Sequence, residues 1–122
     1  MEEARYHKRL GFPEGTDDLL SRFLDGFGSV RYSTHAKYET IQDSRGIIPV
    51  LKKSDLHADQ CFEIVVIGQQ IIKAAFQIIG NKELNYAYVI SCEGVVITCW
   101  ANAEDDDHQT LDETKYIVYA KA

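Results

Sequence analysis

The sequence predicts an α+β fold in which N-terminal helices pack on an antiparallel β-sheet. Two observations lead to this class. Helix start and stop signals bracket two segments in the first half of the 122 residues, and the second half consists of β-branched and aromatic runs separated by short turns. Because tight turns join antiparallel neighbours, these runs predict a meander of four strands, covered on one face by the helices.

The first predicted helix spans residues 17–25. Thr16 before it is a residue type that caps helix N-termini, and Gly26 after it is the type that ends helices. Two aspartates open the segment, where the positive end of the helix dipole favours negative charge. We assign residues 1–28 to an N-terminal helical extension and residues 29–122 to the core of a single domain.

A short strand and a second helix follow. The strand covers Ser29–Tyr32, and Ser33 or Thr34 then caps a helix that runs to about Ser44. The meander strands are predicted at Phe62–Ile67, Gln70–Ile79, Asn85–Ser91 and Val95–Asn102. In the five-stranded form of the prediction, residues 115–120 add a terminal edge strand.

The charge balance is acidic and uneven. The chain has 13 Lys and Arg against 19 Asp and Glu, a formal net charge of −6, and 45% hydrophobic residues, which suffice for one core. Residues 1–60 carry nine basic and ten acidic side chains, whereas residues 61–122 carry four and nine. An acidic excess disfavours a simple nucleic-acid-binding module, but it leaves room for a local cationic groove.

Nothing in the sequence predicts export or a membrane span. The first residues are charged, and no apolar run approaches the ~18 residues that a membrane helix needs. Cys61, Cys92 and Cys99 form no CxxC pair and lie in or beside apolar runs, so we expect buried free thiols in a reducing cytoplasm. The prediction is a cytoplasmic protein with no cofactor and no bound metal.

His35 is the first candidate for chemistry. It lies in the first turn of the second helix, where the helix dipole favours a neutral imidazole, the form that acts as a general base. Arg31 precedes it, and Arg45 at the far end of the helix is a permanent cation that can reach a phosphate. The alternative is a packing histidine with solvated arginines, which spacing alone favours.

The last predicted strand has one polar side. Thr98, Trp100 and Asn102 alternate along it, so their side chains point to the same face. The acidic run Glu104–Asp107 and then His108 follow. This run lacks the fixed offsets of a calcium loop or a zinc site, so a solvated acidic loop is favoured over a metal site.

Lys73 interrupts an otherwise apolar strand. With a period of two it shares a face with Ile71, Ala75 and Gln77, a mixed face that either lines a cleft or meets solvent. His7 lies in polar surroundings and is predicted to be a surface residue.

The order of these motifs along the chain is itself informative. A strand leads to Thr34-His35-Ala36, Arg45-Gly46-Ile47 follows one helix later, and a four-stranded meander ends in Val-Ile-Thr-x-Trp. This order resembles small ribonuclease-toxin domains of the group that links barnase, EndoU, the tRNase colicins and the RelE toxins. The likeness covers about residues 29–117, and the tail from Trp100 to Tyr116 is similar to the end of some phage and polymorphic-toxin members. It implies helices followed by a four-stranded antiparallel sheet.

The resemblance implies metal-independent cleavage of RNA. The 2′-hydroxyl attacks the adjacent phosphate and leaves a 2′,3′-cyclic phosphate and a 5′-hydroxyl. His35 would be the base and His108 the acid, or the reverse. The other implied roles are charge stabilisation by Lys73 and Arg45, hydrogen bonding by Thr98 and Tyr116, and substrate binding by Arg31, Trp100, Asn102 and Tyr116.

A non-enzymatic interaction protein is the alternative function. It would be an inhibitor, an immunity-type protein or a phage accessory protein on a degenerate ribonuclease-like fold. The scarcity of cations after residue 60 and the net charge of −6 favour it, because complementary fields steer binding to a basic partner. The expected partner is therefore RNA in the first case and a protein inhibitor or basic protein in the second. A metal-dependent hydrolase using Asp105–His108 is a third, less favoured reading.

Overall fold

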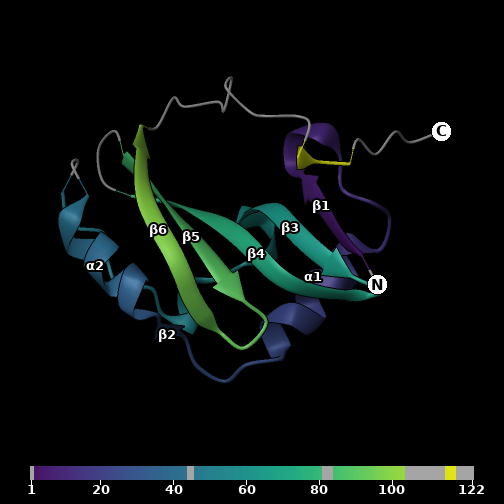
Figure 1. Ribbon diagram of the computed structural model, residues 1–122, viewed down its shortest axis with the longest axis horizontal. Coiled ribbons are helices and arrows are strands. Elements are labelled where there is room, and N and C mark those ends of the chain that lie inside the picture. The colour runs from purple at the N-terminus through teal and green to yellow at the C-terminus, as the bar shows by residue number, and fades with distance from the viewer. Residues whose placement is uncertain (1, 44–45, 81–83, 104–114, 118–122) are drawn as a thin grey trace.

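The computed structural model places six strands in one mixed sheet (Figure 1). It describes residues 2–43, 46–80, 84–103 and 115–117. The strand order is β1-β3-β4-β5-β6-β2. In chain order the elements are β1 (Glu3–His7), η1 (Lys8–Leu10), α1 (Thr16–Asp25), β2 (Arg31–Tyr32), α2 (Thr34–Gln42), η2 (Lys53–Asp55), η3 (Ala58–Gln60), β3 (Cys61–Ile67), β4 (Gln70–Ile79), β5 (Leu84–Ser91) and β6 (Val95–Ala103). The predicted α+β class is confirmed.

The four central strands form the predicted antiparallel meander. Strands β3 to β6 begin and end within one residue of the predicted positions, and each pairs with its neighbour in the chain. The agreement is close because alternating β-branched and aromatic residues, bounded by turn residues, are a local signal.

The two edge strands depart from the prediction. β1 pairs antiparallel with β3, with Arg5 opposite Val65, and β2 pairs in parallel with β6, with Arg31 opposite Val95. The sheet therefore has more strands than the predicted four or five and is not wholly antiparallel, and residues 1–28 contribute a strand as well as helices. The charged β1 segment has little strand propensity of its own, and the free edge of β3 supplies its backbone partners.

The C-terminal residues that the structure describes do not form the predicted edge strand. Residues 115–117 have no strand conformation. The Ile117 N–H donates to the Arg5 carbonyl at 2.8 Å, so this short stretch lies beside β1. Residues 118–120 lie outside the described residues.

The helix starts show two different caps. Helix α1 begins at Thr16, one residue earlier than predicted, after Gly15 with a left-handed φ of 84°. The Thr16 hydroxyl donates to the Pro13 carbonyl at 2.6 Å, so this side chain braces the preceding turn and does not cap the helix. In α2 the Ser33 hydroxyl accepts from the Ala36 N–H at 3.1 Å, which makes Ser33 the cap.

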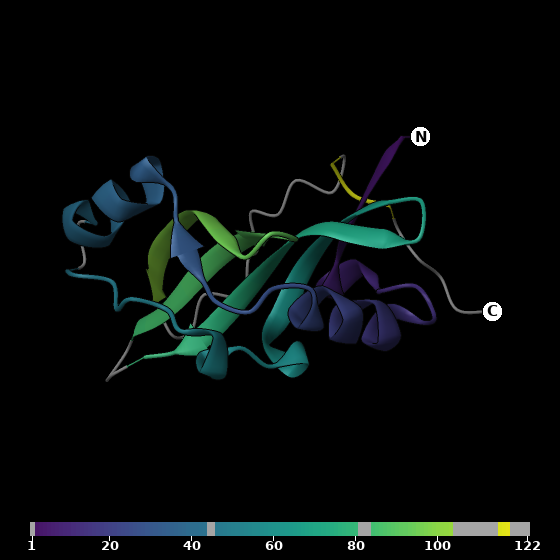
Figure 2. The same cartoon turned by 90° about the horizontal axis from the view of Figure 1, so that it is seen from below.

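One face of the sheet is covered by α1 and the short helices η2 and η3 (Figure 2). The Phe23 ring of α1 stacks on Phe76 of β4 with centroids 6.3 Å apart, and the Tyr88 hydroxyl donates to the Pro49 carbonyl at 2.7 Å. Helix α2 lies instead beside β6, at the border of the sheet (Figures 1 and 2). None of the helices in the described part of the chain is long and apolar enough to cross a membrane.

The other side of the sheet, which we call the second face, carries a mixture of small, apolar and polar residues. On the central strands the register assigns to it Glu63, Val65, Lys73, Ala75, Gln77, Ile79, Asn85, Ala87, Val89, Ser91, Thr98, Trp100 and Asn102. Register shifts leave Phe62, Ile72 and Ile97 without partners in the ladder. These bulges switch the alternation, so Ile71 lies in the core and not, as predicted, on the face of Lys73.

Candidate functional site

A groove of about 480 Å³ lies between α2 and β6. His35 and Glu39 line it from the helix, and Cys99 and Trp100 line it from the strand. Strand β2 pairs only with Val95 and Val96, so beyond that point α2 takes the place of a neighbouring strand along β6. Two of the residues predicted for the site, His35 and Trp100, therefore meet in one groove.

Glu39 joins two predicted site residues. Its Oε1 accepts from the Thr98 hydroxyl at 2.5 Å and lies 3.1 Å from Nε2 of His35. The His35 side chain is 73% exposed, whereas that of Glu39 is 29% exposed. The Glu39 carboxylate thus contacts one imidazole nitrogen of His35, and the rest of the ring is open to solvent. A histidine oriented by a carboxylate is a common arrangement for a general base.

Glu39 also has a structural role at the open edge of β6. The same Oε1 accepts from the Cys99 N–H at 3.3 Å, and Asp43 Oδ2 accepts from the Ala101 N–H at 3.1 Å. The acidic side chains of Glu39 in α2 and of Asp43, which follows the helix, thereby satisfy strand donors that no neighbouring strand reaches. Glu39 was not among the predicted site residues. Its spacing of four residues from His35 on one helix is a signal that indicates that contact, whereas its strand partners, Thr98 and Cys99, lie about 60 residues further along the chain and leave no local signal.

Trp100 and Asn102 lie on the second face, as their alternation with Thr98 predicted. Asn102 stands directly opposite Asn85 of β5. Both residues are buried, at 7% and 5% exposed, and Asn102 Nδ2 and Asn85 Oδ1 have no hydrogen-bond partner among the residues that the structure describes. Buried amide atoms without partners are uncommon in native proteins and call for an explanation.

Lys73 and Arg31 do not join the His35 cluster. Lys73 is half-buried on the second face, where it stands opposite Ser91 of β5, so β5 separates its strand from β6. Arg31 is exposed on the edge strand β2. Lys73 thus lies on the same face as Thr98 but two strands away from it, and Arg31 lies on the edge strand of the sheet.

Tyr116 occupies a second polar cluster, at β1 and β3. Its hydroxyl donates to Oε1 of Glu63, and Oε2 of Glu63 lies 3.2 Å from Arg5. The ring of His7 meets the Tyr116 ring edge-on, with centroids 5.4 Å apart. His7 is 2% exposed, so the prediction that it is a surface residue is wrong; the aromatic rings around it bury it.

The remaining predicted residues lie outside the described residues. These are Arg45, His108 and the acidic run Glu104–Asp107. Among the residues that the structure does describe, no group of three His, Cys, Asp or Glu side chains is arranged to hold a metal ion.

The three cysteines are free thiols, and Cys61 and Cys99 are buried as expected, whereas Cys92 is only half-buried. Burial raises the pKa of Cys61 to about 12 and that of Cys99 to about 11, so neither is a thiolate at neutral pH. Because the thiolate is the nucleophilic form, these two groups are structural.

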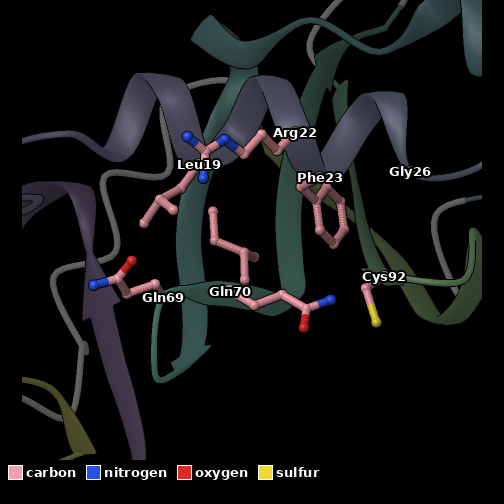
Figure 3. Close-up of a pocket in the computed structure, with 8 residues that line it drawn as sticks. Leu19, Arg22, Phe23, Gly26, Gln69, Gln70 and Cys92 are labelled. Atoms are coloured by element: carbon pink, nitrogen blue, oxygen red, sulfur yellow. The ribbon is translucent and has the colours of Figure 1, made fainter.

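Another hollow, of about 370 Å³, lies on the helix side of the sheet between α1 and the turn after β3 (Figure 3). Arg22 and Gln70 border it, and Asp18 holds the Arg22 guanidinium at 2.8 Å. None of the predicted site residues that the structure describes lines it. We therefore assign no chemistry to it.

A scan against protein-family models finds no match to this sequence, and searches of curated proteins and of solved structures find none either.

Proposed function

We propose that the protein is a metal-independent endoribonuclease of the toxin type. The observation that carries the proposal is the shared carboxylate: Glu39 Oε1 lies 3.1 Å from His35 Nε2 and 2.5 Å from the Thr98 hydroxyl, beside Trp100. An exposed imidazole, a hydroxyl and an indole in one groove supply a base, a hydrogen-bonding group and a stacking platform for RNA.

The contact between His35 and Glu39 supports one choice of the imidazole nitrogen that takes the proton. When the Nε2–H of neutral His35 donates to Glu39, Nδ1 carries the lone pair and takes the proton from the RNA 2′-hydroxyl. The 2′-oxygen then bonds to phosphorus, and the bond from phosphorus to the 5′-oxygen breaks. The leaving 5′-oxygen needs a proton from an acid, and His108 stays the predicted donor. The products are a 2′,3′-cyclic phosphate and a 5′-hydroxyl.

Cleavage of single-stranded RNA in EDTA tests the proposal. We expect the wild type to cut and to leave cyclic phosphate ends, detected by mass spectrometry. His35→Ala should lower the rate by about 100-fold or more, since a general base contributes ~10²–10⁴-fold. Glu39→Gln should lower it about 10-fold, because the amide orients the ring less strongly. Exposed His57 supplies the matched control, His57→Ala, which should cut like the wild type.

Unchanged cleavage by His35→Ala would contradict the proposal, and so would a requirement for a divalent metal. Thermal melting of each variant separates a lost base from a lost fold. This control matters for Glu39, whose carboxylate also binds the Cys99 N–H.

A protein-interaction function is the second candidate, and one observation favours it. Large apolar side chains stand exposed on α2 and the segment after it: Tyr38 (57%), Ile41 (65%), Ile47 (74%) and Val50 (68%). Exposed apolar patches often mark protein interfaces. This candidate predicts no RNA cleavage and no growth arrest on expression, whereas a toxin predicts both.

A further inference from the structure

The groove between α2 and β6 is lined by acidic and aromatic side chains. With histidine counted as neutral, its charged side chains are those of Glu39 and Asp43, and in the described part of the chain no lysine or arginine lines it. Tyr38 and Trp100 line the same groove. Carboxylates attract a cation, and so do the faces of aromatic rings. The composition of the groove therefore favours a cationic ligand.

All contacts of the Glu39 carboxylate fall on one of its oxygens. Oε1 accepts from the Thr98 hydroxyl at 2.5 Å and from the Cys99 N–H at 3.3 Å, and it lies 3.1 Å from His35 Nε2. Within the described residues no group binds the other oxygen, Oε2, and the side chain is 29% exposed. Each oxygen of an ionised carboxylate can accept about two hydrogen bonds. Oε2 is therefore an acceptor for a donor that enters the groove.

Helix α2 buries small residues and exposes large apolar ones. Its buried residues are Ala36 and Thr40, whereas Tyr38 and Ile41 are 57% and 65% exposed. Tyr38 and Ile41 are three residues apart and so lie on the same side of a helix that forms the border of the molecule (Figures 1 and 2). Surface helices usually turn their large apolar residues to the core, so this exposed pair indicates a second interface.

The exposed apolar residues are continuous with the groove. Tyr38 belongs to both, since it lines the groove and is largely exposed. Beyond Ile41, the Ile48 N–H donates to the Thr40 carbonyl at 2.8 Å, which holds the segment with the exposed Ile47 against the last turn of α2. A ligand in the groove thus has an apolar surface beside it, which a peptide can use and a small free cation cannot.

We propose that the groove binds an arginine side chain of a partner protein, and that an apolar side chain next to this arginine packs on Tyr38 and Ile41. The guanidinium donates to Glu39 Oε2 and stacks on an aromatic ring, which a planar cation does better than the ammonium group of lysine. Binding does not require the ribonuclease function. Its consequence rests on that function: an arginine beside His35 keeps RNA out of the groove.

The fluorescence of Trp100 tests the proposal, because Trp100 is the single tryptophan of the sequence and lines the groove. The probe is the peptide acetyl-Leu-Arg-Leu-amide, and the control peptide has citrulline, an uncharged isostere of arginine, at the central position. The arginine peptide should change the fluorescence saturably. The citrulline peptide should bind about tenfold more weakly, because its donor to the carboxylate carries no charge.

Two variants separate the acidic part of the groove from the aromatic part. Glu39→Gln should raise the Kd of the arginine peptide about tenfold, because it removes the anionic acceptor. Tyr38→Ala should raise it about threefold, and because Tyr38 is exposed the fold is kept. The matched controls, Glu14→Gln and Ile79→Ala, remove an exposed charge and an exposed apolar side chain outside the groove and should bind like the wild type.

The outcomes distinguish this proposal from the ribonuclease function. Equal binding of the two peptides, or binding of neither, would overturn the arginine site, whatever the wild type does to RNA. A fluorescence change with a 2′-O-methyl RNA dinucleotide but not with the arginine peptide would overturn it as well. A wild type that binds the arginine peptide and cuts no RNA would overturn only the ribonuclease proposal. When both proposals hold, the arginine peptide inhibits RNA cleavage and the citrulline peptide does not.

Discussion

The two faces of the sheet are built from different side chains, although every strand contributes to both. On the helix side, neighbouring strands present Phe76, which is 0% exposed and stacks on Phe23 of α1, and Tyr88, which is 2% exposed and donates to the Pro49 carbonyl. On the second face the same strands present Ala75 and Ala87, with Gln77 next to them. Ala75 and Ala87 are buried as well, at 2% and 0% exposed. The comparison teaches that the centre of the sheet is buried on both faces, but that the large apolar side chains are concentrated on the helix side.

The largest expected effect is the difference in unfolding free energy between variants of Phe76 and Gln77, which are adjacent in β4 but lie on opposite faces of the sheet. Phe76→Ala should lower the free energy of unfolding by about 3–5 kcal/mol, because it leaves a cavity under the Phe23 ring. Gln77→Ala should change it by no more than about 0.5 kcal/mol. Urea unfolding measures both, and similar losses for the two variants would refute the contrast between the faces.

The second largest effect is expected at alkaline pH, which should lower the free energy of unfolding through the buried thiol of Cys61. The pKa of Cys61 is raised by burial from 9.0 to about 12, so the neutral thiol is favoured in the folded state. The stabilisation is fully present below pH 9, where both states are protonated. It is lost as the pH rises toward 12, because the unfolded thiol ionises first. The slope is at most about 1.4 kcal/mol per pH unit for one thiol.

Urea unfolding at pH 8.0, 9.5 and 10.5 measures this slope. Other buried groups titrate in the same range, so the comparison is with Cys61→Ala, which should show a flatter decline with pH. Equal slopes for the variant and the wild type would show that the Cys61 thiol does not contribute.

The smallest effect concerns the paired amides of the second face. Asn85→Val combined with Asn102→Val should raise the free energy of unfolding by about 1 kcal/mol, because it removes two buried polar atoms that lack partners within the described part of the chain. A loss of stability in urea unfolding would show that the amides are satisfied in solution.

The meander and both α-helices follow from local sequence. Gly26 ends α1, Ser33 caps α2, and alternating residues mark each central strand within one residue of its observed ends. These signals act between residues that are close in the chain, so helix and strand bounds can be predicted from the sequence. The alternation of Thr98, Trp100 and Asn102 likewise indicated their common face.

The edge strands and the centre of the candidate site depend on partners far along the chain. β1 exists because β3 offers a free edge, and Glu39 matters because α2 lies beside β6. Three register shifts, at Phe62, Ile72 and Ile97, decide which side chains reach the second face. Sequence periodicity reports which residues prefer to be buried, but hydrogen-bond partners 60 residues apart are chosen only when the whole sheet assembles.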